Sequence, residues 1–285
     1  MLTGVSGAAL LTPFFLIVFP LLGLPKLTPA EAIATALFLE IFGFTSGTVG
    51  YVRRRMIDYK TALPLVAVAI PFGVLGSIFS QNIDGTLLKG IYGGCMFPLA
   101  AYLYITSRQM NLHSPGVGAM AAQPEEASDL AAPGEDKRVI ISNDGLVYRY
   151  RVMKSRLGAL ITAVGATSTG LISSGLGEVQ LSQLSRRFRL PLPIAAATSV
   201  FIVTITVYGA TGAHIFQLIE RGGVNAVPWD VIAWALPGAI IGGQVGARLQ
   251  GHLPTRFLEY LILAIFLTVG VVLVLNATAL QSLLD

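Results

Sequence analysis

Long apolar runs separated by short polar segments set the pattern of this chain. Three of these runs contain no Asp, Glu, Lys or Arg, at residues 61–80, 157–177 and 190–219. A membrane-spanning helix needs about 20 apolar residues, so each of the three is long enough. Similar runs cover residues 5–25, 32–52, 87–106, 231–247 and 257–275. The pattern therefore predicts an all-α, polytopic membrane protein rather than a β-barrel, whose strands are short and alternate.

The second half of the chain repeats part of the pattern of the first. The matching segments are 32–54 with 195–217, 69–77 with 235–243, and 4–13 with 175–184. In the second pair, Pro71 and Pro237 each stand five residues before a glycine, at Gly76 and Gly242. Internal duplication of this kind is typical of membrane transporters, with the two copies parallel or inverted.

Basic residues in the loops indicate that the repeats are inverted, because Lys and Arg concentrate in cytoplasmic loops. In the first repeat the loop at 52–60 is strongly basic and the next one, at 81–89, is not. In the second repeat the order reverses, since the loop at 248–256 is more basic than the loop at 219–230. Inversion requires an odd number of crossings per repeat. The polar segment 175–184 is therefore expected to cross the membrane, facing protein or a water-filled cavity.

We predict about eight to nine membrane segments in two inverted repeats. Residues 1–106 form an N-terminal transmembrane repeat, 107–156 a small cytoplasmic connector, and 157–285 a C-terminal transmembrane repeat. Residues 157–174 have no counterpart in the first repeat, which is expected to lack its first helix through a misassigned start or a genuine deletion. If the glycine-rich segments only re-enter the membrane, the count falls to seven or eight. The connector carries Asn143-Asp144-Gly145 between alternating residues, which predicts a β-hairpin.

Composition agrees with the membrane assignment and limits other functions. Hydrophobic residues make up 54% of the chain and charged residues 12%, about half the share in a soluble domain. The net charge of +4 fits basic cytoplasmic loops and requires no nucleic-acid partner. One Cys and three scattered His predict neither a disulfide within the chain nor a metal site. No cofactor is expected, and no HExxH, GxSxG or Walker A motif indicates an enzyme or an ATP-driven pump.

Two glycine-rich segments suggest how an anion would be bound. A helix that begins inside the membrane presents free backbone N–H groups and the positive end of its dipole, and glycines let a ligand approach the backbone. We expect two such starts to meet at the repeat interface, where transporter substrates bind. Close helix packing is the alternative role of these glycines. The candidate binding residues in the two segments are Gly4, Ser6, Gly7, Gly175 and Gly177.

Other polar side chains complete the candidate site. Three residues are placed there as hydroxyl donors, namely Thr35, Thr198 and Ser199. Two more, Gln180 and Gln183, are placed there as amide donors. The alternative for each hydroxyl is a hydrogen bond to the backbone of its own helix.

Two acids inside membrane segments are candidates for proton coupling. Glu40 lies in the middle of an otherwise uncharged run, where an ionised carboxylate is costly to bury. Glu178 lies beside the proposed anion site and is expected to be protonated when the anion is bound. The alternative for Glu40 is a neutral carboxyl that hydrogen-bonds a neighbouring helix.

Several motifs, taken in order, carry a resemblance to a known family. The segments GVSGAALLTP, AIATA, YVRRRMID and AAATS, with the two Pro–Gly spans, resemble the sulfite exporter TauE/SafE family of membrane transporters. The resemblance covers nearly the whole chain except residues 107–156. The chain departs from the family pattern in a thinner first glycine cluster, in Glu178 where a glycine is expected, and in Ala34-Thr35-Ala36 in place of an ATS-type motif.

The resemblance implies a secondary transporter, more an exporter than an importer, for small sulfur-containing anions such as sulfite or organosulfonates. The alternatives are uptake of another small organic or inorganic anion and a membrane subunit without transport activity. We expect a multi-pass protein of the inner (plasma) membrane that contacts the lipid bilayer and a small anionic substrate. The sequence leaves open the coupling ion and the oligomeric state, with a homo-oligomer among the alternatives.

Overall fold

The computed structural model describes residues 6–111, 135–153, 155–249 and 255–281, most of which are helical. The first half begins with a continuous helical stretch and continues with three long helices; in order these are α1 (Ala8–Pro13), the π-helical η1 (Phe14–Val18), α2 (Phe19–Leu21), α3 (Pro29–Arg53), α4 (Tyr59–Asn82) and α5 (Gly85–Asn111). The second half contains α6 (Arg156–Ile172), α7 (Leu176–Arg186), α8 (Leu192–Gly222), the 3₁₀ turn η2 (Val224–Ala226), α9 (Trp229–Leu249) and α10 (Thr255–Gln281). Helices therefore occupy the apolar runs identified above and also the polar segment at 175–184.

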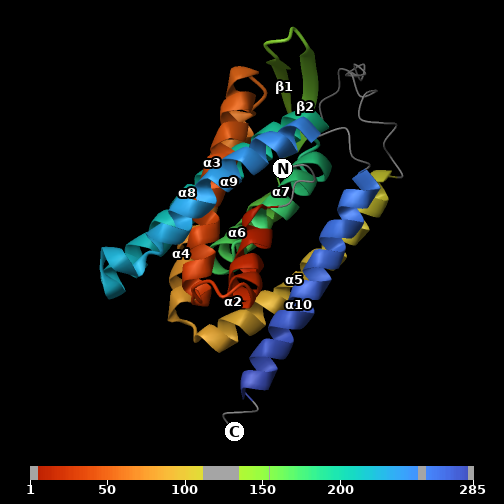
Figure 1. Ribbon diagram of the computed structural model, residues 1–285. Helices are drawn as coiled ribbons and strands as arrows, with labels where there is room; N and C mark the ends of the chain where they lie inside the picture. The colour runs from red at the N-terminus through yellow and green to blue at the C-terminus, as the bar shows by residue number, and fades with distance from the viewer. Residues whose placement is uncertain (1–5, 112–134, 154, 250–254, 282–285) are drawn as a thin grey trace.

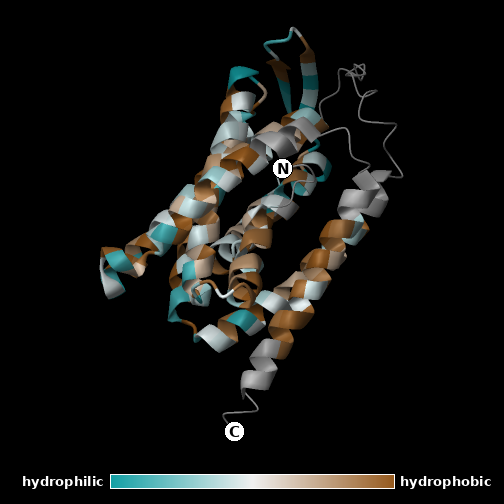
Figure 2. Ribbon diagram, viewed as in Figure 1, coloured by the Kyte–Doolittle hydropathy of each residue, from teal (hydrophilic) through white to brown (hydrophobic). Residues whose placement is uncertain are grey.

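The hydropathy of the helices supports a membrane-embedded bundle. Within the described residues, α3, α4 and α8 are long and apolar enough to cross a bilayer. Shorter apolar helices cover Ala8–Leu21, Arg156–Ile172, Trp229–Gly242 and Tyr260–Leu275. Figure 2 shows apolar residues along the helices and hydrophilic residues at the hairpin and near several helix ends. The all-helical character of the membrane part is confirmed, whereas the number of crossings and the inverted orientation of the repeats stay predictions.

Polar caps fix where several helices begin. Thr28 and Glu31 form a capping box at the start of α3, in which the Glu31 N–H donates to Thr28 Oγ1 at 3.3 Å. Asp58 caps α4 and Ser155 caps α6 by accepting a backbone N–H from the first turn. Each cap satisfies a backbone donor that a buried helix end would otherwise leave unpaired.

The polar stretch that begins at Ser173 ends one helix and starts another. α6 ends at Ile172, and Ser173 takes a left-handed conformation with a φ of 55°. Gly175 has a φ of 128°, and a Cβ added there would lie 2.7 Å from the Cβ of Ser168. Only glycine fits this conformation and this space, so α7 can begin at Leu176 directly after the turn.

The helices form a bundle with a separate pair along one side (Figure 1). α4 packs against α6 and α8, α3 packs against α8 and α9, and α5 pairs with α10. The crossing of α4 and α6 is so close that side chains are excluded from it. A Cβ on Gly76 would lie 2.2 Å from the backbone oxygen of Thr167, and one on Gly170 would lie 2.0 Å from the backbone oxygen of Gly73.

The β-hairpin expected in the connector is confirmed. β1 (Glu135–Ile141) pairs antiparallel with β2 (Val147–Met153), and Gly145 turns the chain between them with a φ of 79°. The hairpin extends beyond the helix ends in Figure 1. One of its faces joins the hydrophobic core through the buried side chains of Tyr148, Tyr150 and Val152.

Candidate functional site

Glu40 reaches from the middle of α3 to the start of the helical stretch Ala8–Leu21. Its Oε1 accepts the backbone N–H of Ala8 at 3.1 Å and the hydroxyl of Ser6 at 2.5 Å. Glu40 and Ser6 are buried, whereas Gly7 is exposed, and a Cβ on Gly7 would lie 3.8 Å from the same carboxylate oxygen. The Glu40 side chain thus occupies the N-terminal end of this helix, where the helix dipole favours a negative charge.

The same helix start contacts the break between α6 and α7. The hydroxyl of Ser6 lies 3.2 Å from the backbone oxygen of Ser173, and the hydroxyls of Thr12 and Ser173 are 2.7 Å apart. Ser173 and its neighbour Ser174 are fully buried. The structure therefore brings the two glycine-rich segments together, through Ser6 on one side and Ser173 on the other.

The start of α7 is capped from within the protein. Thr169 Oγ1, on α6, accepts the backbone N–H of Leu176 at 3.0 Å. This first donor of α7 is therefore already bound, as at an ordinary N-cap. Gly177 lies in the first turn of α7 and is half-buried. Two further candidates, Gly4 and the side chain of Glu178, lie outside the described part of the chain.

Gln180 and Gln183 lie on α7 and face α6. Their side chains hydrogen-bond to each other, and Gln183 Nε2 also donates to Thr162 Oγ1 at 2.8 Å. All three residues are buried. Within the described residues, Gln180 Nε2 and Gln183 Oε1 have no hydrogen-bond partner. Buried amide groups of this kind are uncommon, so the pair offers one donor and one acceptor to a ligand or a water molecule.

Thr35 is fully buried on α3, five residues before Glu40. A threonine inside a helix commonly donates to a carbonyl of its own helix. The Thr35 hydroxyl has no hydrogen-bond partner within the described residues. Thr35 therefore retains the free hydroxyl that a donor to a ligand requires.

Thr198 and Ser199 are placed differently from the other candidates. Thr198 Oγ1 accepts the backbone N–H of Asp58 at 3.1 Å, and Ser199 donates to a carbonyl of its own helix. Asp58 follows the end of α3, which lies at Arg53, roughly 20 Å along the helix axis from Glu40. The structure therefore does not bring Thr198 and Ser199 to the contact between Glu40 and Ser6, and both hydroxyls have local structural roles.

Sequence reasoning missed three hydroxyl residues near the candidate site, namely Thr162, Thr169 and Ser173. Thr162 and Ser173 contact candidate residues, and Thr169 caps Leu176, which lies between Gly175 and Gly177. Each lies in an apolar run, where bonding to the backbone of its own helix is the common role of a hydroxyl. Ser173 carries the one usable signal, because it opens the run SSGLG next to the glycine that turns the chain. Nothing in the sequence sets Thr162 and Thr169 apart from other threonines of the membrane segments.

The contact of Glu40 with the start of α1 combines two kinds of chemistry in one place. A carboxylate can take up a proton, and the backbone N–H groups of a helix start can bind an anion. Within the part of the chain that the structure describes, no three His, Cys, Asp or Glu side chains are grouped so that they could hold a metal ion. The described groups therefore suit anion binding that is linked to a proton.

Comparisons with known proteins agree on a membrane transport family. A family model described as sulfite exporter TauE/SafE matches residues 1–273. The chain is 23% identical over 270 residues to the probable membrane transporter protein YunE of Bacillus subtilis (strain 168), covering 94% of this chain and 90% of YunE. It is 25% identical over 217 residues to the probable membrane transporter protein MamO of Magnetospirillum gryphiswaldense, covering 73% of this chain but 33% of MamO. No solved structure matches the chain.

Proposed function

This chain belongs to the sulfite exporter TauE/SafE family, and from this premise we propose that it exports small sulfur-containing anions, such as sulfite or organosulfonates, as a proton-coupled secondary transporter. Its apolar helices and its family make it an integral membrane protein. The two relatives described as probable membrane transporters support transport as its activity. We place it in the inner (plasma) membrane as a multi-pass protein.

The observation that carries this proposal is the contact between Glu40 and the first turn of α1. The Glu40 carboxylate accepts the Ala8 N–H at 3.1 Å, in the position where a substrate oxyanion would be bound by a helix N-terminus. A sulfite or sulfonate oxygen placed there would compete with Glu40 for the same donor. The exposed Gly7 next to this donor leaves the backbone open to a small ligand.

Protonation of Glu40 would decide whether its own carboxylate or the substrate anion occupies the helix start. The ionised carboxylate satisfies the positive end of the helix dipole by itself, and a second negative charge beside it would be repelled. When Glu40 takes up a proton, the charge is removed and the Ala8 N–H becomes available to substrate. Proton and anion therefore bind together, so the affinity for the anion rises as the pH falls. Export then requires the outward gradient of the anion, with the membrane potential, to outweigh the inward proton gradient.

The buried glutamine pair would supply the second half of the binding site. Gln180 lies one helical turn beyond the start of α7, about 6 Å along its axis. Its Nε2 is a buried donor with no partner among the described residues, and Thr35 Oγ1 is another. Neutral donors fit a proton-coupled site, because a permanently charged side chain would bind the anion whether or not Glu40 is protonated.

Binding and flux measurements on the purified protein test the proposed function. We expect sulfite and sulfoacetate to bind the protein and to cross the membrane of liposomes that contain it, with acetate a weaker substrate. Protein-free liposomes and liposomes with the heat-denatured protein serve as controls. Flux of acetate in preference to both sulfur compounds would contradict the substrate class, whereas no flux above the controls for any of the three anions would contradict transport of these anions.

A further inference from the structure

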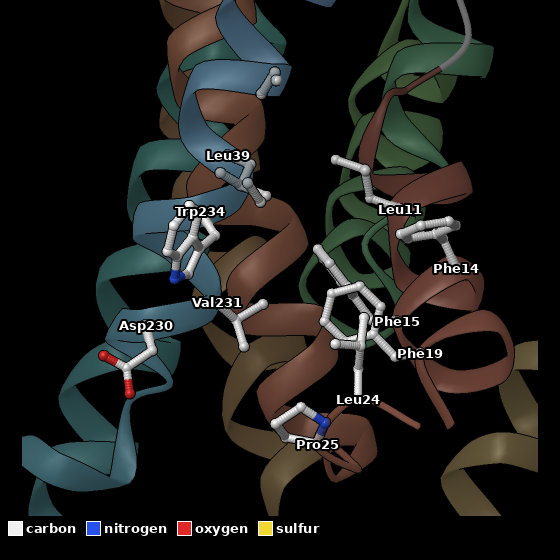
Figure 3. A pocket seen from close by; sticks show the side chains of 13 residues that line it. Leu11, Phe14, Phe15, Phe19, Leu24, Pro25, Leu39, Asp230, Val231 and Trp234 are labelled. Carbon is white, nitrogen blue, oxygen red and sulfur yellow. The ribbon is translucent and has the colours of Figure 1, made fainter. Parts of the chain in front are cut away.

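A groove that is apolar except for Asp230 at the start of α9 separates α9 from the first helical stretch of the chain. Figure 3 shows its two walls, with Val231 and Trp234 on one side and Phe15 and Phe19 on the other. Its volume is about 640 Å³, and Leu39 of α3 also contributes to the lining. Trp234 is 86% exposed, so a large aromatic side chain beside the groove lacks cover from the described residues.

The sequence match between the two halves of the chain shows which position of the repeat this groove corresponds to. The matching segments pair α1 with α7, α3 with α8, and α4 with α9. α6 has no partner in this match, and it packs against α4, α7 and α8. The counterparts of these three helices are α9, α1 and α3, and each of them contributes to the lining of the groove, together with η1, α2 and the loop that follows α2. The groove is therefore the place that a counterpart of α6 would occupy in the first half.

The glycines of α4 are packed against another helix, whereas, among the described residues, the matching small residues of α9 are not. On α4, a Cβ on Gly76 would lie 2.2 Å from the Thr167 backbone of α6. On α9, a Cβ on the matching Gly242 would meet no atom within 4 Å among the described residues. One turn earlier, Gly73 of α4 lies between α6 and α8: a Cβ on Gly170 of α6 would meet the Gly73 backbone oxygen at 2.0 Å, and a Cβ on Gly73 itself would meet Thr206 of α8 at 3.0 Å. Its counterpart, Ala239, lines the groove. α9 thus carries the small residues of a helix crossing, and no helix of the described part of the chain lies opposite them.

We propose that this groove seats one further membrane-spanning helix, packed on α9 as α6 is packed on α4. Small residues allow two helix backbones to approach closely in a bilayer, where packing rather than hydrophobicity drives helix association. The seated helix is apolar, has Gly or Thr at the crossing, and ends next to Ser6 and Ala8, as α6 ends next to α7. This inference concerns assembly and does not depend on the transported substrate.

A peptide with the sequence of α6 provides a defined probe, because α6 is the helix whose counterpart the groove would hold. A fluorescent peptide of residues 155–173 would be titrated against detergent-solubilised protein labelled at Val224→Cys in a Cys95→Ala background. Val224 is exposed and precedes α9 without lining the groove, so a label there would report energy transfer from a seated peptide. We expect saturable energy transfer.

Matched substitutions separate binding in the groove from binding elsewhere. The pair Ala239→Leu and Gly242→Leu would fill the crossing and should weaken binding by at least about tenfold. Gly94→Leu is the control, because Gly94 is an exposed glycine of α5 with no atom near its Cβ position among the described residues. A peptide with Gly170→Leu should also bind at least about tenfold more weakly, since a bulky residue at the crossing blocks close approach.

Four outcomes would overturn this inference. The first is the absence of saturable binding to a folded protein, as judged by its circular dichroism. The second is equal binding to the groove variant and to the Gly94→Leu control. The third is a dimer of the unmodified protein that becomes monomeric in the groove variant, because the occupant would then be a second copy of this chain. The fourth would come from native mass spectrometry. If the Leu pair displaces only lipid and no peptide binds, acyl chains occupy the groove and a helix does not.

Discussion

The Arg138 guanidinium of the hairpin donates from Nη1 to both carboxylate oxygens of Asp58, each at 2.6 Å. Asp58 is the N-cap of α4, and its carboxylate also accepts the hydroxyls of Tyr150 at 3.1 Å and Thr61 at 2.9 Å. The side chains of Arg138 and Asp58 are 13% and 4% exposed. Asp58 thus has two roles: it caps α4, and it anchors the hairpin of the connector to the helical bundle.

Replacing Arg138 with Ala should destabilise the protein by about 3 kcal/mol, because removal of one partner leaves the Asp58 charge buried without its counterion. The loss should appear as a lower midpoint of thermal unfolding in detergent and as faster proteolysis of the hairpin. Arg149→Ala is the matched control, since Arg149 is an exposed arginine of the same hairpin. Equal midpoints for the two variants would show that the ion pair does not hold the hairpin in place.

The Tyr150 hydroxyl gives this anchor a dependence on alkaline pH. Burial, and then the neighbouring Asp58 charge, raise the pKa of Tyr150 above its ordinary value of 10.0. A raised pKa in the folded state means that the stabilising contribution is complete below pH 10 and is lost as the pH rises above it. Above pH 10, the unfolding free energy of the unmodified protein should fall faster than that of Tyr150→Phe, by up to about 1.4 kcal/mol per pH unit. Parallel pH profiles of the two proteins, followed by thermal unfolding, would contradict this prediction.

The sequence predicts the hairpin but not where it docks. Asn143, Asp144 and Gly145 specify the turn locally, and the alternation of Tyr148 and Tyr150 marks one face as apolar. The surface that receives this face comes from residues far away in the sequence, because Asp58 lies 80 residues before Arg138. Arg138 and Asp58 are individually ordinary charged residues of loops, so only the fold reveals their pairing.

The α4–α6 crossing makes a prediction about single methyl groups. Gly76→Ala should destabilise the protein by about 1–3 kcal/mol, because the added Cβ would meet the Thr167 backbone at 2.2 Å and the helices must move apart. Gly94→Ala adds the same group in open space on α5. This control should be neutral or stabilising by up to about 1 kcal/mol, since Ala favours a helix over Gly. Similar unfolding midpoints for the two variants would mean that the crossing is looser than the structure indicates.

The candidate site could be predicted residue by residue but not as a cluster. The glycine clusters, Glu40 and the glutamine pair stand out because polar or flexible residues are rare in apolar runs. The contact of Glu40 with Ala8 joins residues 32 positions apart. Loop charges and hydrophobic periodicity do not indicate which residues far apart in the sequence come into contact. For the same reason, the sequence pattern groups Thr198 with this site, whereas in the structure its hydroxyl accepts a hydrogen bond from the backbone N–H of Asp58.

Replacing Gln180 and Gln183 should weaken substrate binding without lowering the stability of the protein. In a double variant of Gln180→Met and Gln183→Met, the buried amide atoms without partners disappear, each of which costs about 1–3 kcal/mol when unsatisfied. We expect the double variant to unfold at the same or a higher temperature, but to bind sulfite at least about tenfold more weakly. Gln217→Met, on the half-buried face of α8, is the control and should change neither property. Unchanged sulfite binding by the double variant would remove these residues from the proposed site.

Glu40 provides the most direct test of proton coupling. Glu40→Gln keeps a side-chain oxygen that can accept the Ala8 N–H, so the helix start stays capped, but the group can no longer gain or lose a proton at ordinary pH. In the unmodified protein, the affinity for sulfite should rise by up to about tenfold for each unit by which the pH falls, as long as Glu40 is ionised without substrate. In Glu40→Gln the affinity should become nearly independent of pH, apart from the titration of sulfite itself.

Two comparisons make the result of this substitution specific. Glu31→Gln replaces an acid in the capping box of the same helix with a residue that can also cap it, and should keep the pH dependence of the unmodified protein. Glu178→Gln tests the second acid, next to the glycines of α7. Sulfite binding would be measured by calorimetry between pH 6 and pH 8, with methanesulfonate, which stays a monoanion over this range, as the reference ligand. If both Glu40→Gln and Glu178→Gln keep the unmodified pH dependence for this ligand, neither acid carries the coupled proton, and the competition between Glu40 and substrate for the start of α1 does not occur.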